Sequence, residues 1–421
     1  MKTKVLIPVL LLLSLGAAAQ TTKKELLKDI NRTGGVYLIY PGPSQKALTP
    51  APAGYEPFYI SHYARHGSRY MIDNVCYVKA ISKLDSAAQM GILSRKGAQV
   101  LEILKAGYAD AENRDGELTA LGGRQHRETA RRMYDRYPEL LSQPLKVDAR
   151  SSTVGRCMLS MFNFCQELQG LNPAMDIRMD ASKGDMRFIV HNGHIKPEET
   201  PQTQGFIDHV NAMRERAYKP SRLMKLLFTN VREAESFIDA EDLMECLFQV
   251  ASDFQNVPEL GLSMTDIFTK DELFNIWNYY NSSWILNTGL VPGSTPSYLT
   301  KADIRDTLAS MADRVIRNGK PTLTLRFSHD GCVLALVYLM GLKEATGANT
   351  NIENLYKTIS IDKLIPMAAN VQMVFYRKEG SDDILVKFLL NENETTIPAL
   401  KTNVPPYYHW ADVRSYWETR K

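Results

Sequence analysis

The sequence lacks a strong excess of charge of either sign. Its 421 residues carry 50 basic and 47 acidic side chains, a formal net charge of +3. This balance does not indicate nucleic acid or an anionic membrane as a partner, so any anion-binding function must come from a local cluster. The sequence also has no internal repeat, no low-complexity tract and, after residue 15, no apolar run long enough to span a bilayer. Its composition, 44% hydrophobic and 23% charged, is that of a globular protein with two or three domain-sized units.

Cysteine is scarce and odd in number: the sequence has Cys76, Cys157, Cys165, Cys246 and Cys332. At most two bridges can form. Cys157 and Cys165 lie two turns apart on one predicted helix, at about 12 Å, and so cannot pair with each other. Buried single thiols are the default interpretation. No Cys-x-x-Cys or His-Glu-x-x-His motif is present, and His191-x-x-His194 has no carboxylate at a convincing position, so we expect a surface loop there, no metal site and no cofactor.

The first twenty residues have the three regions of a secretory signal. Met1 to Lys4 is basic, residues 5–15 are apolar, and residues 16–20 are small and end in Ala19-Gln20. The apolar run is shorter than the roughly 20 residues of a spanning helix, which argues against a membrane anchor. We therefore predict a signal peptide at residues 1–19 with cleavage after Ala19, and a periplasmic or secreted protein.

The most informative stretch is Arg65-His66-Gly67-Ser68-Arg69, which follows the mixed apolar run 58–64. A strand that ends here places an imidazole between two permanent cations at a point where glycine allows a tight turn. Guanidinium groups match the tetrahedral oxyanions of phosphate, and histidine can attack phosphorus or carry a proton. The alternative is an exposed basic turn with a solvated histidine.

Two later strands also end in polar residues. Residues 145–149 predict a strand that leads into Arg150, and apolar residues at helical spacing predict a helix over 154–170. An arginine beside a helix N-terminus is a second anion site, although for this stretch taken alone plain helix capping with Arg150 in a surface ion pair is the better explanation. Residues 321–328 predict a strand that ends at His329-Asp330, followed by a buried helix over 332–340.

The remaining pattern completes an α/β chain. We expect helices over 80–104 and 118–141, the second with its five arginines on a solvated face: Arg124, Arg127, Arg131, Arg132 and Arg136. Between 183 and 319 helical patterns and proline-bearing loops replace the strands, which indicates an inserted helical cap. Residues 370–376 and 384–390 predict a hairpin, and the aromatic tail from Pro405 should dock on the body.

Ligands of open α/β sheets bind at the carboxyl ends of strands, so the three motifs are expected to converge. In their order and separation they resemble those of the histidine acid phosphatases, the secreted branch of the phosphoglycerate-mutase-like clan that includes phytases and multiple inositol polyphosphate phosphatases. The residues that carry the resemblance are 65–69, Leu118-Thr119-Ala120-Leu121-Gly122, Arg150-Ser151-Ser152 with Arg156, and His329-Asp330.

The resemblance implies an α/β fold with a phosphoglycerate-mutase-like core, which is a central, mostly parallel sheet flanked by helices. A mainly α-helical cap is inserted into this core. We place the core in residues 20–182 and 320–421 and the cap in 183–319. The implied activity is acid hydrolysis of a small phosphomonoester through a phosphohistidine, with phytate or other inositol polyphosphates as candidate substrates. His66 would be the nucleophile and Asp330 the proton donor. The residues expected to bind the phosphate are Arg65, Arg69, Arg150 and His329.

Two departures from the family pattern bear on the substrate. Tyr70-Met71 stands where many phytase-like members have a proline, and His329-Asp330-Gly331 stands where the inositol polyphosphate phosphatases usually have His-Ala-Glu. Rival interpretations are a phosphotransferase or phosphomutase of the same clan, a non-catalytic module that binds phosphorylated ligands, and, with less support, a metallophosphatase. For hydrolysis, His66 has to be unprotonated while Asp330 is protonated, which predicts a bell-shaped pH profile on the acid side.

Overall fold

The computed structural model describes residues 22–45, 47–190, 200–288, 291, 303–345 and 352–420. The predicted signal peptide and the His191/His194 pair lie outside these residues. Within them, every helix is too short or too polar to cross a membrane.

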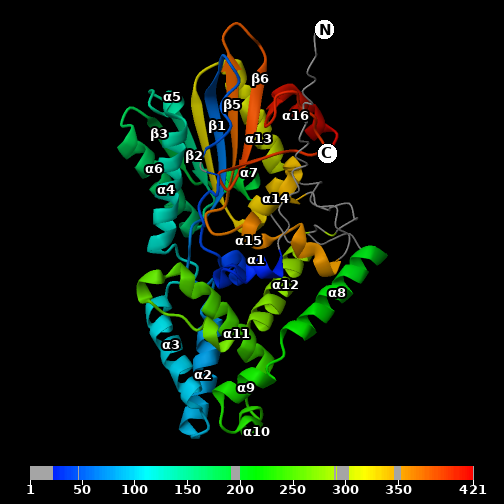
Figure 1. The fold of residues 1–421 in the computed structure, drawn as a ribbon. Coiled ribbons are helices and arrows are strands. Elements are labelled where there is room, and N and C mark those ends of the chain that lie inside the picture. Colours follow the sequence, from blue (N-terminus) through cyan, green and yellow to red (C-terminus); the bar gives the residue numbers. More distant parts are fainter. Residues whose placement is uncertain are drawn as a thin grey trace, which may run out of the picture.

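A single mixed sheet forms the centre of the upper part of the molecule (Figure 1). Its strands are β1 (Tyr55–Arg65), β2 (Lys146–Ser151), β3 (Asp176–Asp180), β4 (Thr322–Ser328), β5 (Asn370–Lys378), β6 (Ile384–Leu390), β7 (Asn393–Thr395) and β8 (Tyr407–His409). They run in the order β3-β2-β4-β1-β5-β6-β7, and β8 pairs with β6. The first four in this order are parallel, and β5 to β8 continue the sheet antiparallel.

The predicted α/β class, with a central sheet flanked by helices, is confirmed. The sheet is more mixed than expected because the hairpin β5–β6 pairs directly with the parallel half through β1. β1 is buried along nearly its whole length, as expected of a strand with a neighbour on each side and helices on both faces.

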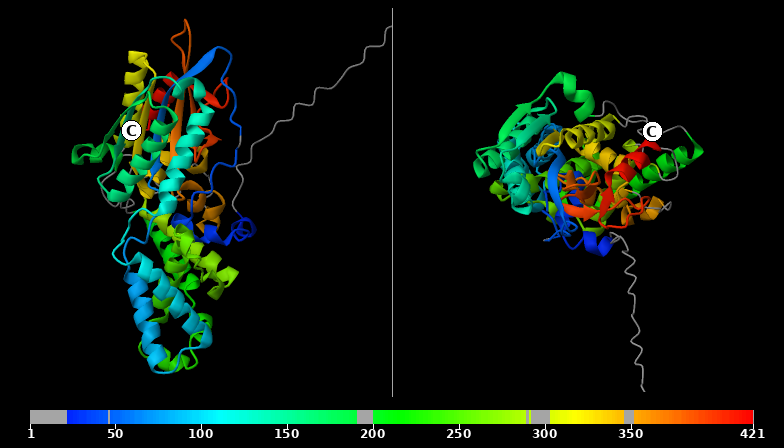
Figure 2. Two further views of the ribbon diagram at one scale, coloured as in Figure 1. Left: turned by 90° about the vertical axis from the view of Figure 1, so that its left-hand side faces the viewer. Right: turned by 90° about the horizontal axis from the view of Figure 1, so that it is seen from above.

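Helices cover both faces of the sheet (Figure 2). On one face α4 (Ala120–Arg136), α5 (Pro138–Leu141) and α6 (Gly155–Leu171) share a hydrophobic cluster with β2 and β4. On the other face lie α13 (Asp303–Asn318), α14 (Asp330–Met340) and α16 (Trp410–Glu418). The predicted docking of the aromatic tail is confirmed, since Trp417 is fully buried in this second cluster.

The lower part of the molecule is helical, and its boundaries differ from those expected. It contains α2 (Val75–Gln89), α3 (Arg95–Ala111), α8 (Pro201–Ala217), α9 (Ser221–Leu227), α10 (Val231–Ala234), α11 (Ala240–Asp253) and α12 (Lys270–Asn287). One hydrophobic cluster joins α2 and α3 to α9, α11 and α12, although we assigned α2 and α3 to the core. Conversely α13, placed in the cap, packs on the core cluster. The cap is therefore built from two separate stretches of chain.

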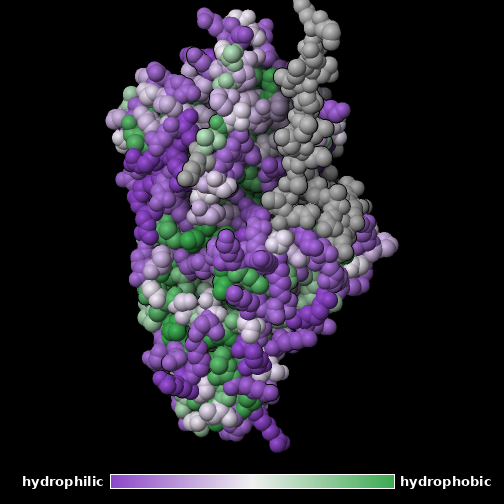
Figure 3. Space-filling view, viewed as in Figure 1, coloured by the Kyte–Doolittle hydropathy of each residue, from purple (hydrophilic) through white to green (hydrophobic). Residues whose placement is uncertain are grey.

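The remaining helical elements are short. The short α-helices are α1 (Lys23–Leu26), α7 (Met186–Ile189) and α15 (Ile361–Leu364). The 3-10 helices are η1 (Ile30–Tyr37), η2 (Lys183–Asp185), η3 (Phe254–Asn256), η4 (Pro258–Leu260), η5 (Thr265–Ile267), η7 (Lys343–Ala345) and η8 (Ile352–Lys357). η1 contacts α11, α12 and α15, so it packs between the helical part and the core. On the face in Figure 3, apolar surface residues gather mainly on the helical part.

Candidate active site

Three strand ends meet at the edge of the sheet that faces the helical part. Arg65, the last residue of β1, is in register with Ser328, the last residue of β4. The backbone N–H of His66 donates to the Ser328 carbonyl at 2.9 Å, and that of Ser152, after β2, donates to the Phe327 carbonyl at 3.0 Å. The expected convergence of the motifs after β1, β2 and β4 is therefore present in the structure.

The His66 ring is oriented by the backbone. His66 is 1% exposed, and its Nδ1 lies 2.9 Å from the carbonyl oxygen of Gly67. Because a carbonyl only accepts, Nδ1 carries the proton and Nε2 holds the free lone pair. Burial, followed by the charges of Arg65, Arg69 and Arg156, lowers the pKa of His66 well below its usual value. The neutral form of the imidazole is therefore favoured in the free site.

Two glycines let the loop after β1 pack against the start of α4. A Cβ on Gly67 would lie 2.4 Å from the Gly122 carbonyl oxygen, and one on Gly122 would lie 2.3 Å from that of Ser68. The Ser68 N–H donates to Gln125 Oε1 at 2.8 Å, and Thr119 caps α4 by accepting from the Gly122 N–H at 3.2 Å. Packing and hydrogen bonds of the 118–122 motif and the start of α4 thus fix the position of the 65–69 loop.

Two arginines of this loop are fixed by carbonyl oxygens. Arg65 is fully buried, and its Nη1 donates to the carbonyls of Val36 at 2.8 Å and Ile365 at 2.6 Å. Its Nη2 lies 3.0 Å from Asp330 Oδ2. Arg69 donates from Nη1 to the Tyr70 carbonyl at 2.8 Å, and its guanidinium lies 5.3 Å from the centre of the Tyr37 ring. Both cations are held before any ligand arrives.

Arg156 contributes the third positive charge that acts on His66, and the structure pairs Arg150, which we expected to bind the phosphate, with carboxylates. Arg150 is held by carboxylates: its Nε lies 3.2 Å from Asp148 Oδ1, and its Nη1 is paired with Asp185. Strand alternation explains this, because Arg150 and Asp148 share one face of β2. Arg156, in the first turn of α6, is among the charges that lower the pKa values of His66 and His329, and Arg150 is not.

His329 and Asp330 stand opposite His66. The ring centres of His329 and His66 are 5.7 Å apart, edge to face, and Ser152 Oγ lies 3.2 Å from His329 Nε2. Burial, together with the charge of Arg156, lowers the pKa of His329 to about 4. For Asp330 burial favours the neutral acid, but Arg65, Arg69 and a hydrogen bond from the Gly331 N–H outweigh it, so its pKa is lowered.

A second carboxyl group, which the sequence did not single out, lies beside Arg69. Asp253 ends α11, is 2% exposed and accepts a hydrogen bond from Asn256 Nδ2 at 3.2 Å. Burial raises its pKa to about 7, although Arg69 acts in the opposite direction. In the sequence Asp253 is an ordinary polar residue at a helix end, and only the packing of α11 on the site reveals it.

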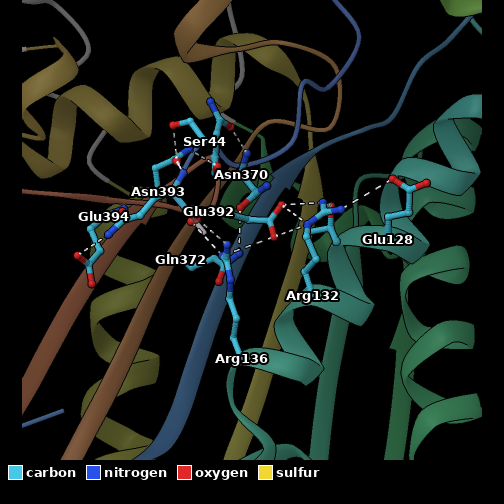
Figure 4. Close-up of polar contacts among 12 residues, drawn as sticks. Ser44, Glu128, Arg132, Arg136, Asn370, Gln372, Glu392, Asn393 and Glu394 are labelled. Carbon is cyan, nitrogen blue, oxygen red and sulfur yellow. Dashed lines mark hydrogen bonds and ion pairs between the residues drawn. The ribbon is translucent and has the colours of Figure 1, made fainter. Parts of the chain in front are cut away.

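Two arginines of α4 also differ from the expected solvated face. Glu392, 1% exposed, accepts from Arg132 Nε at 2.9 Å and from the Tyr40 hydroxyl at 2.8 Å (Figure 4). Arg136 Nη1 donates to the Glu392 carbonyl at 2.9 Å, and Asn370 Nδ2 donates to the Tyr40 hydroxyl at 3.2 Å. This network anchors the start of β5 directly behind the site.

The segment before β5 in turn holds the backbone of the site. The Ala368 N–H donates to the His66 carbonyl at 2.9 Å, and the Arg65 N–H donates to the Ala369 carbonyl at 2.8 Å. Within the described residues, no three His, Cys, Asp or Glu side chains lie close enough to hold a metal ion. The arrangement can bind a tetrahedral dianion and present a neutral imidazole to it.

Comparisons with known proteins agree with this geometry. Residues 64–391 match the family model of the histidine phosphatase superfamily (branch 2). Multiple inositol polyphosphate phosphatase 1 of Gallus gallus is 23% identical over 396 residues, which cover 88% of this chain and 84% of the relative. The fold resembles that of Bifidobacterium longum multiple inositol polyphosphate phosphatase in complex with inositol hexasulfate (TM-score 0.72, 18% identity, 92% and 97% of the chains covered). It also resembles the phytase from D. castellii (TM-score 0.67, 15% identity, 95% and 86% covered).

Proposed function

Because the chain belongs to branch 2 of the histidine phosphatase superfamily, we propose that it hydrolyses phosphomonoesters through a phosphohistidine on His66. The observation that carries this proposal is a neutral, backbone-oriented imidazole beside three arginines, with His329-Asp330 at the end of the neighbouring strand. Phosphoryl transfer requires mainly positioning and neutralisation of spread negative charge, which these groups supply.

In the first step the phosphate is held by Arg65, Arg69, Arg156 and His329. The Nε2 lone pair of His66 attacks phosphorus, an N–P bond forms, and the P–O bond to the ester oxygen breaks. Asp330 gives its proton to the leaving alkoxide, since an unprotonated alkoxide leaves poorly. The proton on Nδ1, donated to the Gly67 carbonyl, keeps the ring in its reactive tautomer.

In the second step water attacks the phosphohistidine. The Asp330 carboxylate now accepts the water proton, the N–P bond breaks, and inorganic phosphate is released. One carboxyl group thus acts as acid and then as base. Asp330 Oδ2 lies 3.0 Å from Arg65 Nη2, one of the groups expected to bind the phosphate, which suits both roles.

For the substrate we propose inositol polyphosphates, phytate included. The support comes from the chicken relative, whose name states that class, and from the helical part, which faces the site through α11 and supplies Asp253 beside Arg69. For the place of action we propose the periplasm or the extracellular space, on the basis of the predicted signal at residues 1–19.

The test is phosphate release from phytate and from an aryl phosphate between pH 3 and 9 with a chelator present. We expect activity on the acid side, its loss in His66→Ala, and no change in His409→Ala, a variant of a histidine on β8 far along the sheet. Trapping labelled phosphate on wild type but not on His66→Ala would identify the intermediate. A wild type that binds phytate and releases nothing would support the binding-module alternative instead, and loss of activity on chelation would support a metallophosphatase.

A further inference from the structure

Helices α2 and α11 pack antiparallel in the helical part, and polar contacts fix their register. Lys79 Nζ on α2 lies 2.8 Å from Asp242 Oδ1 on α11. One turn further along α2, Lys83 Nζ donates to the Phe237 carbonyl, which precedes α11, at 2.9 Å. As the number rises on one helix it falls on the other. Cys76 lies one turn before Lys79 on α2, and Cys246 lies one turn after Asp242 on α11. The antiparallel register therefore places Cys76 opposite Cys246.

The two thiols are therefore neighbours at this position. The register places the two side chains next to each other across the helix pair, and the Cys76 side chain, followed by burial, raises the pKa of Cys246. Cys246 is 3% exposed, whereas Cys76 is partly exposed. A cavity of about 220 Å³ lined by Lys79, Lys83, Asp242 and Cys246, among others, lies along the same helix pair.

The other three cysteines have different surroundings. Cys157 Sγ donates to the Ser328 carbonyl at 3.2 Å, and Cys165 lies in the core cluster beneath the sheet. Cys332 is in the first turn of α14 and belongs to the cluster on the other face. No disulfide joins any of the five in the structure. Among the five, Cys76 and Cys246 are the pair that the helix register places on facing sides of two packed helices.

We propose that Cys76 and Cys246 form a disulfide that ties α2 to α11 when the protein meets an oxidising thiol–disulfide environment. The partly exposed Cys76 thiolate attacks a disulfide oxidant and forms a mixed disulfide, and one thiol of the oxidant leaves. The Cys246 thiolate then attacks the Cys76 sulfur and the second thiol leaves. Two protein thiols are oxidised by two electrons, one disulfide oxidant is reduced, and two protons pass to the leaving thiolates.

Such a bridge has a clear structural effect. Residues 76 and 246 are distant in sequence, so the bond closes a long loop and restricts the unfolded chain strongly. It joins the two separate stretches of chain that make up the helical part, one containing α2 and α3 and the other α8 to α12. Oxidation is therefore expected to raise the melting temperature by several degrees. This inference does not depend on the proposed phosphatase activity.

The experiment compares the purified, fully reduced protein with the same protein equilibrated in excess oxidised glutathione. We expect the number of titratable thiols in denaturant to fall by two. After digestion without reductant, mass spectrometry should find the peptide of Cys76 linked to that of Cys246. Cys76→Ala should lose both the linked peptide and the rise in melting temperature, while Cys165→Ala, the matched control, should keep both.

The wild-type measurement alone can overturn the proposal, so it does not depend on whether Cys246→Ala folds. Five thiols that remain reduced, or glutathione adducts without a linked peptide, would refute it. A bridge between Cys157 and Cys332, which both lie near the active site, would also refute it. An oxidised protein that melts at the same temperature as the reduced one would refute the expected stabilisation by the disulfide.

Discussion

The buried histidines His62 and His126 are expected to limit stability at the acid pH at which the proposed enzyme works. His62 is 0% exposed, and its ring centre lies 4.9 Å from that of Phe164 and 6.0 Å from that of Phe327. His126 is 1% exposed and packs on the same Phe327 ring at 5.4 Å. Burial lowers the pKa of each histidine to about 3.

The sign and size of the effect follow from these values. Between pH 6.5 and about 3 the unfolded chain protonates both histidines and the folded chain does not, so the free energy of unfolding falls as the pH falls through this window. Above pH 6.5 neither state binds the protons and the effect vanishes. At about 1.4 kcal/mol per pH unit and per histidine, lowering the pH from 6.5 to 4.5 costs about 2.7 kcal/mol for each.

The perturbation is His62→Leu, which removes one titrating group from an apolar site. Unfolding by urea at pH 7 and pH 4.5 gives the loss of stability between the two pH values. We expect the variant to lose about 2.5 kcal/mol less than wild type over this interval, whatever its stability at pH 7. Leu168→Ala, in the same hydrophobic cluster, is the control: it should be destabilised about equally at both pH values. A His62→Leu variant with the wild-type pH dependence would refute the reasoning.

The other predictions concern the site itself. Asp330→Asn should reduce turnover of phytate far more than turnover of an aryl phosphate, whose phenolate leaves without protonation, and equal losses on both substrates would contradict the donor role. In wild type the alkaline limb of kcat should lie at higher pH than that of kcat/KM, because bound phosphate offsets the arginines that lower the pKa of Asp330 in the free enzyme. Arg156→Ala should lower kcat/KM about 10²-fold or more, and Arg150→Ala should lower it only a few-fold. A larger loss in Arg150→Ala than in Arg156→Ala would show that Arg150 binds the phosphate instead. Glu392→Ala should lower the free energy of unfolding in urea by about 3 kcal/mol, because it leaves Arg132 and Arg136 without their buried partner. A decrease below about 1 kcal/mol would count against a stabilising role of this network.

Much of the fold and of the site follows from the sequence because strand ends carry their own signal. Strand patterns that lead into Arg65, Arg150 and His329 predict three strands, and parallel strands bring their carboxyl ends to one edge. The order of the motifs then identifies the family. The structure confirms these strands, with ends shifted by a few residues, and the hairpin of β5 and β6.

The predictions and the structure differ where the sequence indicates which side of a helix or strand is buried or charged but not which residues contact that side. The helical spacing of residues 80–104 does not state which helices pack on them, and the structure joins α2 and α3 to α11 in one hydrophobic cluster. Likewise the charged pattern of α4 cannot reveal that Arg132 points at a carboxylate some 260 positions later in the chain. Alternation along β2 did contain the information on Arg150, since Asp148 two residues earlier shares its face.

The low pKa of Asp330 in the free protein does not conflict with its proposed role as an acid. The charges that keep it ionised, Arg65 and Arg69, are the charges expected to bind the phosphate. A phosphate dianion placed between them brings negative charge close to the carboxylate, which favours its protonated form. His66 responds to the same charges in the opposite way, because cations oppose a second positive charge on its ring. One set of arginines thus keeps the expected nucleophile neutral in the free protein, and its neutralisation by substrate prepares the donor, so Asp330 reaches its working protonation state only when a phosphate is bound.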